Sequence, residues 1–187
     1  MSDNQFDTPY GKPLAAMHMM GNLIIPDERI LTALHNSRIV ENLRDFEINV
    51  LANLFTVQYF EVKELVAELD DSLKDTLMIL IEGEIEVSAM VGNESVLLHL
   101  EMPGDIARII SFIGGNIVNI SARLKVKKNS AVLLLQRSRL ETLLHTHPSI
   151  VYCVMRNLIQ HVHAVARRKN AENAEMSNYI YRIHGRY

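Results

Sequence analysis

The stretch TLMILIEGEIEVSAM, residues 76–90, decides the fold class because its pattern is that of an extended chain. In its second half, Ile85, Val87 and Ala89 alternate with polar residues, which is the period of a strand that buries one face and wets the other. The first half is continuously apolar. Gly83 follows that apolar run, so we expect two strands that turn or bend there.

More strand-like segments follow on the C-terminal side. Gly92-Asn93 is a turn signal and precedes the apolar segment SVLLHL, residues 95–100. Apolar residues then alternate with basic ones over residues 122–127, and SAVLLLQ, residues 130–136, has the composition of a more buried strand. About seven or eight short strands separated by turns indicate an antiparallel barrel or jelly roll.

Helical patterns lie on both sides of these strands. On the N-terminal side, Glu28 stands in a first helical turn and Ile48 begins a second apolar helical stripe. On the C-terminal side, Ser138 and Glu141 form a capping-box pattern for a short helix, and Pro148 suits the first turn of a longer one. The predicted fold class is therefore α+β and mainly β, an antiparallel β-barrel or jelly roll flanked by N-terminal helices and a long C-terminal dimerisation helix.

The pattern divides the chain into four parts. They are a loose N-terminal segment (residues 1–13), a helical segment (14–58), the β-barrel (59–137), and the C-terminal helices with the tail (138–187). A length of 187 residues with 48% hydrophobic content suits one domain with a substantial core.

An apolar stripe in the last helix predicts a dimer. Its residues are spaced 4, 3, 4 and 3 apart, which is the seam of a coiled coil of about two heptads: Val151, Met155, Leu158, Val162 and Val165. We expect a parallel homodimer joined along this seam. Two heptads are marginal alone, so the barrels must add contacts.

Four short motifs occur in an order and spacing that resemble a known family. They are LMILIEGEIEVS at residues 77–88, MPGD at 102–105, Ser121-Ala122 at the start of a strand, and LETLLHTHPSI at 140–150. The match covers about residues 45–168 and is similar to the cyclic-nucleotide-binding domain, in particular the sensory domain of bacterial regulators of the catabolite-activator type. The resemblance implies a jelly roll that acts in regulation and signal transduction in bacteria.

The segment that binds the phosphate in this family, here residues 108–122 and called the cassette below, departs from the family pattern. In the family a Gly-Glu pair opens the cassette and an Arg-(Ser/Thr)-Ala triplet closes it; the Glu accepts a ribose hydroxyl and the Arg pairs with the cyclic phosphate. Here Arg108 stands at the glycine, Ile109 at the Glu and Ile120 at the Arg, whereas Ser121 and Ala122 are kept.

Loss of the two charged ligands makes cyclic-nucleotide binding doubtful. Each charge-assisted contact is worth about 1.5–3 kcal/mol, so losing two lowers affinity by several orders of magnitude. We therefore expect no cofactor, and a regulatory or scaffolding role exercised through protein contacts. The alternative is a sensor that holds a nucleotide or another anion in a non-standard pocket through Arg108 and Ser121.

DNA binding is not expected. In this family a helix-turn-helix domain of about 60–80 residues follows the dimer helix, whereas about twenty residues follow Arg168 here, so we expect a stand-alone sensory domain. Residues 1–105 carry 19 acids and 6 bases, and residues 106–187 carry 3 acids and 13 bases. This division of charge leaves a third alternative, in which the basic C-terminal half forms a surface that binds nucleic acid non-specifically.

The tail NYIYRIHGRY, residues 178–187, combines aromatic and basic residues that are enriched at interaction sites. Two docking sites are open: the barrel of the partner subunit or a separate, unidentified protein.

Other classes of function lack support in the sequence. No nucleophile–base pair, phosphate-binding Walker loop or paired-carboxylate motif is present, so we expect a protein that is not an enzyme. His161 and His163 stand two apart on a helix, on different faces, which does not favour a metal site. No apolar run is long enough to span a membrane, and a single cysteine, Cys153, suits the cytoplasm.

Overall fold

A computed structural model describes most of the chain. Backbone is described for residues 18–20, 23–25, 28–62, 65–66, 73, 75–91, 94–114 and 122–184, and side chains for residues 28–62, 73, 75–88, 97–114 and 123–168.

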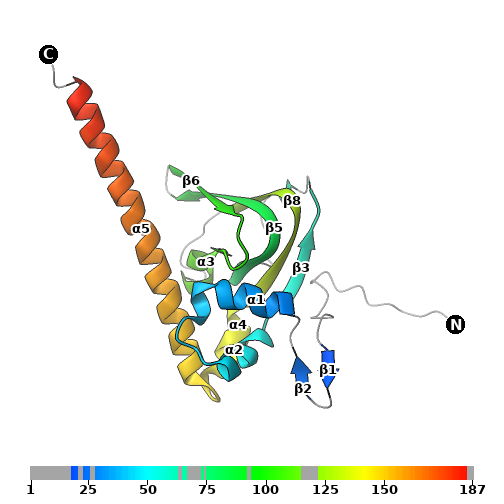
Figure 1. Ribbon diagram of the computed structural model, residues 1–187. Helices are drawn as coiled ribbons and strands as arrows, with labels where there is room; N and C mark the ends of the chain where they lie inside the picture. The colour runs from blue at the N-terminus through cyan, green and yellow to red at the C-terminus, as the bar shows by residue number, and fades with distance from the viewer. Residues whose placement is uncertain are drawn as a thin grey trace.

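An antiparallel sheet forms the centre of the molecule (Figure 1). Its main path is β3-β8-β5-β6, while β4 also pairs with β8 and β7 with β5. The strands are β3 (Thr56–Phe60), β4 (Leu65–Val66), β5 (Thr76–Val91), β6 (Glu94–Leu100), β7 (Ile106–Ala107) and β8 (Ala122–Gln136). The prediction of a mainly antiparallel fold with flanking helices is confirmed. The pairing of the described strands is jelly-roll-like and does not show a closed barrel.

The two strands predicted on either side of Gly83 are a single bent strand, β5. Gly83 has φ +104°, and a Cβ built on it would lie 2.2 Å from Oγ of Ser130. The pairing with β8 changes register around this residue, between Leu80 and Ile85. The Ser130 hydroxyl accepts a hydrogen bond from the Glu84 N–H at 3.0 Å. The bend is therefore taken up as a β-bulge, and the ladder continues past it. β8 is likewise one strand where two were predicted.

The continuous apolar run at the start of β5 is explained by burial on both faces. Leu77 and Ile79 pack into a core shared with the helices. Met78 and Leu80 pack into a second core between the strands. All four side chains are fully enclosed.

The N-terminal helices cover one side of the sheet (Figure 1). They are α1 (Glu28–Asn36), the 3₁₀ turn η1 (Arg38–Val40) and α2 (Asp45–Ala52). The segment 14–58 was predicted to be helical, whereas residues 18–20 and 23–25 are strands. There β1 (His18–Met20) pairs with β2 (Leu23–Ile25) as an antiparallel hairpin.

The predicted capping box at Ser138 does not form. α4 (Arg137–Glu141) begins one residue earlier, and its N-cap, Gln136, makes no side-chain cap; η4 (Thr142–Leu144) follows. Backbone pairing with Asp75 sets this start, because the Arg137 N–H donates to the Asp75 carbonyl at 2.9 Å.

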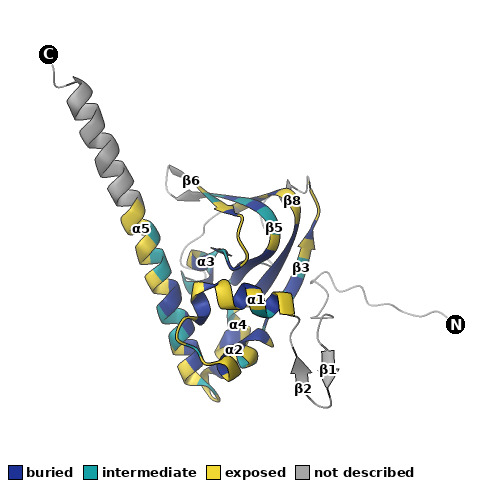
Figure 2. Ribbon diagram, in the orientation of Figure 1, coloured by how far each residue is buried: buried dark blue, intermediate teal, exposed yellow. Residues whose placement is uncertain are grey.

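The last helix, α5 (Pro148–His184), begins at the predicted proline and runs past the sheet (Figure 1). Its first turns bury Ile150, Val154 and Leu158 against the body, whereas residues 163, 164 and 166–168 are exposed (Figure 2). Asn157 fastens this part of the helix to η1, since its Nδ2 donates to the carbonyls of Ile39 at 3.1 Å and Glu41 at 2.7 Å. No helix among the described residues is long and apolar enough to cross a membrane.

Ion pairs join the acidic and basic halves of the sequence. Lys128 Nζ lies 2.8 Å from Glu84 Oε2, and Lys127 Nζ lies 3.1 Å from Glu86 Oε2, across the β5–β8 pair. These hydrogen bonds lower the pKa of both glutamates. The division of charge along the sequence is thus partly cancelled in space, which weakens the case for a single basic surface on β8.

Candidate functional site

The turn before the cassette is packed tightly against the end of α1. Gly104 has φ +98°, and a Cβ built on it would lie 2.8 Å from the carbonyl carbon of Asn36. Oδ2 of Asp105 accepts hydrogen bonds from the N–H groups of Glu101 and Met102, each at 2.9 Å. The Pro-Gly-Asp motif therefore places the first residues of the cassette in a defined position beside β5.

Arg108, which the sequence resemblance aligns with a glycine of the family, has a glycine-like backbone. Its φ is +66°, in the left-handed region that costs other residues about 1–2 kcal/mol. Its Nε donates to the Thr76 carbonyl at 3.2 Å, and a terminal nitrogen donates to the Leu73 carbonyl. Burial lowers the pKa of Arg108, and the nearby Asp75 carboxylate partly opposes that shift. The guanidinium is thus engaged by its own chain.

Ile109 opens the short helix α3 (Ile109–Gly114) and lies in the core shared with the helices. Only 8% of its surface is exposed. An apolar side chain in the core cannot accept a hydrogen bond, so Ile109, which the resemblance aligns with the ribose-binding Glu, contributes to packing.

The rest of the cassette is only partly described. Ile120 and Ser121 lie outside the described residues, and Ala122 begins β8 opposite Ala89 of β5. The structure therefore places Arg108 and Ile109 next to each other and does not test their predicted association with Ser121.

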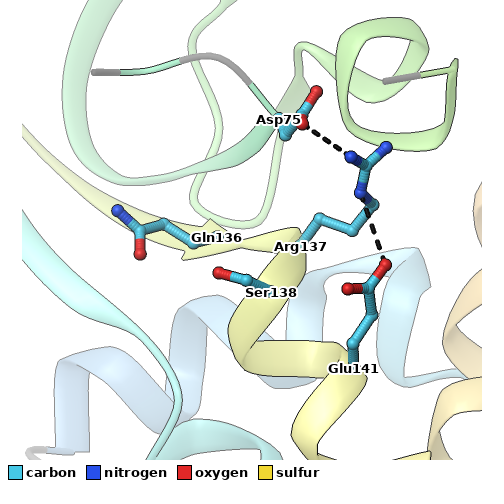
Figure 3. A pocket seen from close by; sticks show the side chains of 5 residues that line it. All are labelled: Asp75, Gln136, Arg137, Ser138 and Glu141. Atoms are coloured by element: carbon cyan, nitrogen blue, oxygen red, sulfur yellow. Dashed lines mark hydrogen bonds and ion pairs between the residues drawn. The ribbon is translucent and has the colours of Figure 1, made fainter. Parts of the chain in front are cut away.

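A polar hollow of about 240 Å³ lies where β8 leads into α4 (Figure 3). Arg137 spans it, with one terminal nitrogen 2.6 Å from Asp75 Oδ2 and Nε 3.5 Å from Glu141 Oε1. Gln136 and Ser138 complete the lining. No local sequence pattern marks this site, because Asp75 and Arg137 are brought together by the pairing of Thr76 with Gln136. Arg137 is already paired with two carboxylates. We therefore interpret the hollow as a structural junction between β8 and α4 and not as a ligand site.

The predicted dimer seam divides into enclosed and partly open residues. Leu158 has no exposed surface and Val151 only 9%, because both lie in the core of their own chain. Met155 and Val162 pack partly against that core, and Val165 is half-buried. A side chain without exposed surface has none to offer a partner, so Leu158 is accounted for within one chain.

Other candidates for chemistry remain isolated in the described part of the chain. No group of three or more His, Cys, Asp or Glu side chains there is arranged to hold a metal ion. His161 is half-buried and His163 exposed, and burial lowers the pKa of His161. Cys153 is a half-buried free thiol.

Comparison with known proteins identifies the fold. No protein-family model matches the sequence, and no curated protein matches it. Among solved structures, a cyclic nucleotide-binding domain from Methylobacillus flagellatus superposes with a TM-score of 0.63 at 21% identity, covering 78% of this chain and 80% of that one. The chain has the cyclic nucleotide-binding domain fold.

Two further structures show how widely this fold occurs. The catabolite activator protein of Thermus thermophilus gives a TM-score of 0.59 at 19% identity, covering 75% of this chain. This chain spans only 63% of the length of that protein. A regulatory subunit of a cAMP-independent protein kinase A from Trypanosoma brucei, in a mutant form bound to cAMP, gives 0.54 at 18% identity, covering 80% of this chain and 51% of that one. At these identities the likeness is one of fold.

Proposed function

We propose that this protein is a non-enzymatic regulatory or scaffolding domain that acts through homodimerisation and protein contacts and does not bind cAMP or cGMP tightly. The observation that carries the proposal is the state of the cassette opening. Arg108 donates to Leu73 and Thr76 of its own chain, and Ile109 is enclosed in the core. These contacts support a cassette opening that does not receive a ribose or a phosphate.

Proteins of similar fold support both halves of this proposal. One is described as the regulatory domain of a Toxoplasma gondii protein kinase A with cAMP, and another as part of a cAMP-independent protein kinase A. The fold is thus compatible with regulation with or without cAMP as the signal. As the sequence led us to expect, we also propose that the protein is bacterial and cytoplasmic and acts without DNA binding or catalysis.

The alternative is an anion sensor with a non-standard pocket. It would rely on Arg108 and Ser121, and the hydrogen bonds from Arg108 to the carbonyls of Leu73 and Thr76 would have to break first. Each such bond from a charged donor is worth about 1.5–3 kcal/mol, so breaking these bonds would lower the affinity for a ligand by a similar free energy. For this reason we favour the protein-contact function.

Isothermal titration calorimetry with cAMP and cGMP tests the proposal. We expect dissociation constants no tighter than the high micromolar range, and a value below about 1 μM for either nucleotide contradicts it. The double variant Arg108→Gly, Ile120→Arg is the matched control, because it restores the glycine and the phosphate-binding arginine of the family. Tighter binding by this variant than by the natural chain supports the assignment of the missing ligands.

A further inference from the structure

Three parts of the chain that are distant in sequence meet at one corner of the molecule. They are the junction of α1 with η1, the turn before the cassette, and the middle of α5. The side-chain amide of Asn157 joins α5 to η1, with distances of 3.1 Å to the Ile39 carbonyl and 2.7 Å to the Glu41 carbonyl. The turn reaches the same junction, because a Cβ on Gly104 would lie 2.9 Å from the backbone nitrogen of Ser37. This corner therefore connects the start of the cassette to α5.

Buried polar atoms without a partner lie at this corner. Oγ of Ser37, Oδ1 of Asn157 and Nδ1 of His161 are enclosed and have no hydrogen-bond partner in the described part of the chain. Ser37 and Asn157 are each only 3% exposed. His161 lies one turn beyond Asn157 on the same side of the helix. Of the three side chains, only that of His161 changes its protonation near neutral pH.

The enclosed ring nitrogen of His161 favours the neutral form of the side chain. A neutral imidazole can leave Nδ1 without a proton, whereas the charged ring carries an N–H on both nitrogens. Protonation would therefore enclose a donor that has no acceptor, and an unpaired buried donor costs free energy. The contact between α5 and the body is thus weaker when the ring is charged.

The charges that face His161 act in the same direction. Burial of the ring is the main cause of its lowered pKa, and the charges of Arg38 on η1 and of Arg168, two turns further along α5, lower it as well. Asp105 in the turn raises the pKa, but Oδ2 of this carboxylate already accepts two backbone N–H groups. α3 also packs against α5 and has no ionisable side chain. The neutral ring is therefore the form that fits this corner.

We propose that this corner is a pH-sensitive clasp formed by Ser37, Asn157 and His161, which holds α5 against η1 while the ring is neutral and loosens when the ring is protonated. Asn157 supplies the hydrogen bonds of the clasp, and His161 supplies its dependence on pH. All these groups belong to one chain, so the inference is independent of homodimerisation and of any ligand. Because the turn before the cassette packs on the same junction, loosening of the clasp removes one support of the residue that follows, Arg108.

The direction of the effect follows from the lowered pKa. When α5 is released, His161 meets water and its pKa returns toward the ordinary value of about 6.5. The released form then binds a proton at a higher pH than the docked form. Docking is therefore fully favoured above about pH 6.5 and is weakened as the pH falls from there toward the lower pKa of the docked form.

Hydrogen–deuterium exchange over residues 157–166 tests the clasp, with the full chain at pH 7.5 and pH 5.5 and rates corrected for the intrinsic effect of pH. In the wild type we expect the protection of these amides to fall at least about threefold more than in His161→Gln, which cannot be protonated. His163→Gln is the matched control, because His163 is exposed on the same helix, and it should behave as the wild type. The same fall in all three chains, or no fall in the wild type, overturns the inference.

Two further measurements do not depend on how well glutamine packs at this position. Proton NMR titration of the His161 ring should give a pKa below about 6.5, and a value at or above it overturns the inference. His161→Arg carries its charge at both pH values, so we expect low protection of α5 at both while the circular dichroism spectrum stays that of a folded chain. A His161→Arg chain as protected as the wild type at pH 7.5 overturns the inference.

Discussion

Nε of Arg108 donates a hydrogen bond to the carbonyl of Thr76 over 3.2 Å, which ties the first residue of the cassette to the first residue of β5. A residue with φ +66° stands where the family has glycine, and its side chain is used within the chain. The backbone at residue 108 therefore has a conformation that glycine adopts readily, while the side chain bonds within its own chain.

Replacement of Arg108 separates backbone strain from side-chain bonding. Arg108→Ala keeps the left-handed backbone and loses the hydrogen bonds, so we expect a loss of roughly 1–3 kcal/mol in the free energy of unfolding. Arg108→Gly loses the same bonds but removes a strain of about 1–2 kcal/mol. Urea denaturation should therefore rank wild type, then Arg108→Gly, then Arg108→Ala. An Arg108→Ala variant as stable as the wild type would contradict the role given to the guanidinium.

The bulge in β5 depends on Gly83. A Cβ there would lie 2.2 Å from Oγ of Ser130 and 2.6 Å from the Asn129 carbonyl oxygen, at a φ of +104°. We expect Gly83→Ala to lower the free energy of unfolding by roughly 2–4 kcal/mol. Ser88→Ala, in the same strand but away from the bulge, is the control and should change it by less than about 1 kcal/mol. Similar effects of the two substitutions would show that the bulge tolerates a side chain.

Asn157 fixes α5 to η1 through two carbonyl oxygens, and only 3% of it is exposed. Asn157→Asp keeps the shape but replaces the donor with a carboxylate that faces Ile39 and Glu41 carbonyls. We expect a loss of roughly 2–4 kcal/mol at pH 7, because a buried charge is left unpaired. The loss should shrink as the pH falls and the carboxyl becomes protonated. Thermal unfolding at pH 7 and pH 5 checks this, and an effect independent of pH would argue against the donor role.

The lysine contacts of Glu84 and Glu86 predict how acid affects stability. Their pKa values are lowered in the folded chain by hydrogen bonds from Lys128 and Lys127. The unfolded chain then binds protons at higher pH, so this stabilisation is present above the ordinary glutamate pKa of about 4.3 and is lost as the pH falls through the lower folded values.

Melting temperatures from pH 6 to pH 3 test the lysine contacts. The Glu84→Gln, Glu86→Gln variant should show a shallower fall than the wild type, and replacing both lysines with methionine should have the same effect. An unchanged acid slope in both variants would mean that the pairs do not hold in solution.

Much of the fold could be predicted because its signals are local. Alternation along residues 84–89 and the apolar run before it reflect burial of one or both faces, and these depend only on the period of a strand. Pro148 marked the start of α5 because proline lacks only a donor that the first turn leaves unused. The glycine-like backbone at residue 108 was not predicted, since an arginine carries no sign of a positive φ.

Signals that depend on a distant partner were misjudged or missed. The capping pattern at Ser138 is intact in the sequence, yet pairing of Asp75 with Arg137 starts the helix one residue earlier. Gly83 signals a bend, but only the neighbouring β8 decides that the bend is a bulge within one strand.

The sequence by itself predicted helices, then strands, then helices from residue 28 onward, the loss of the charged cassette ligands, and the amphipathic character of α5. Only the tertiary structure decided which stripe of α5 is covered. Val151 and Leu158 belong to one apolar stripe of α5, and Tyr152 and Ile159 belong to a neighbouring one. Both stripes have helical spacing, so the sequence pattern does not tell which one is buried. The core encloses Leu158 and leaves Ile159 48% exposed, because the body lies against only one side of the helix.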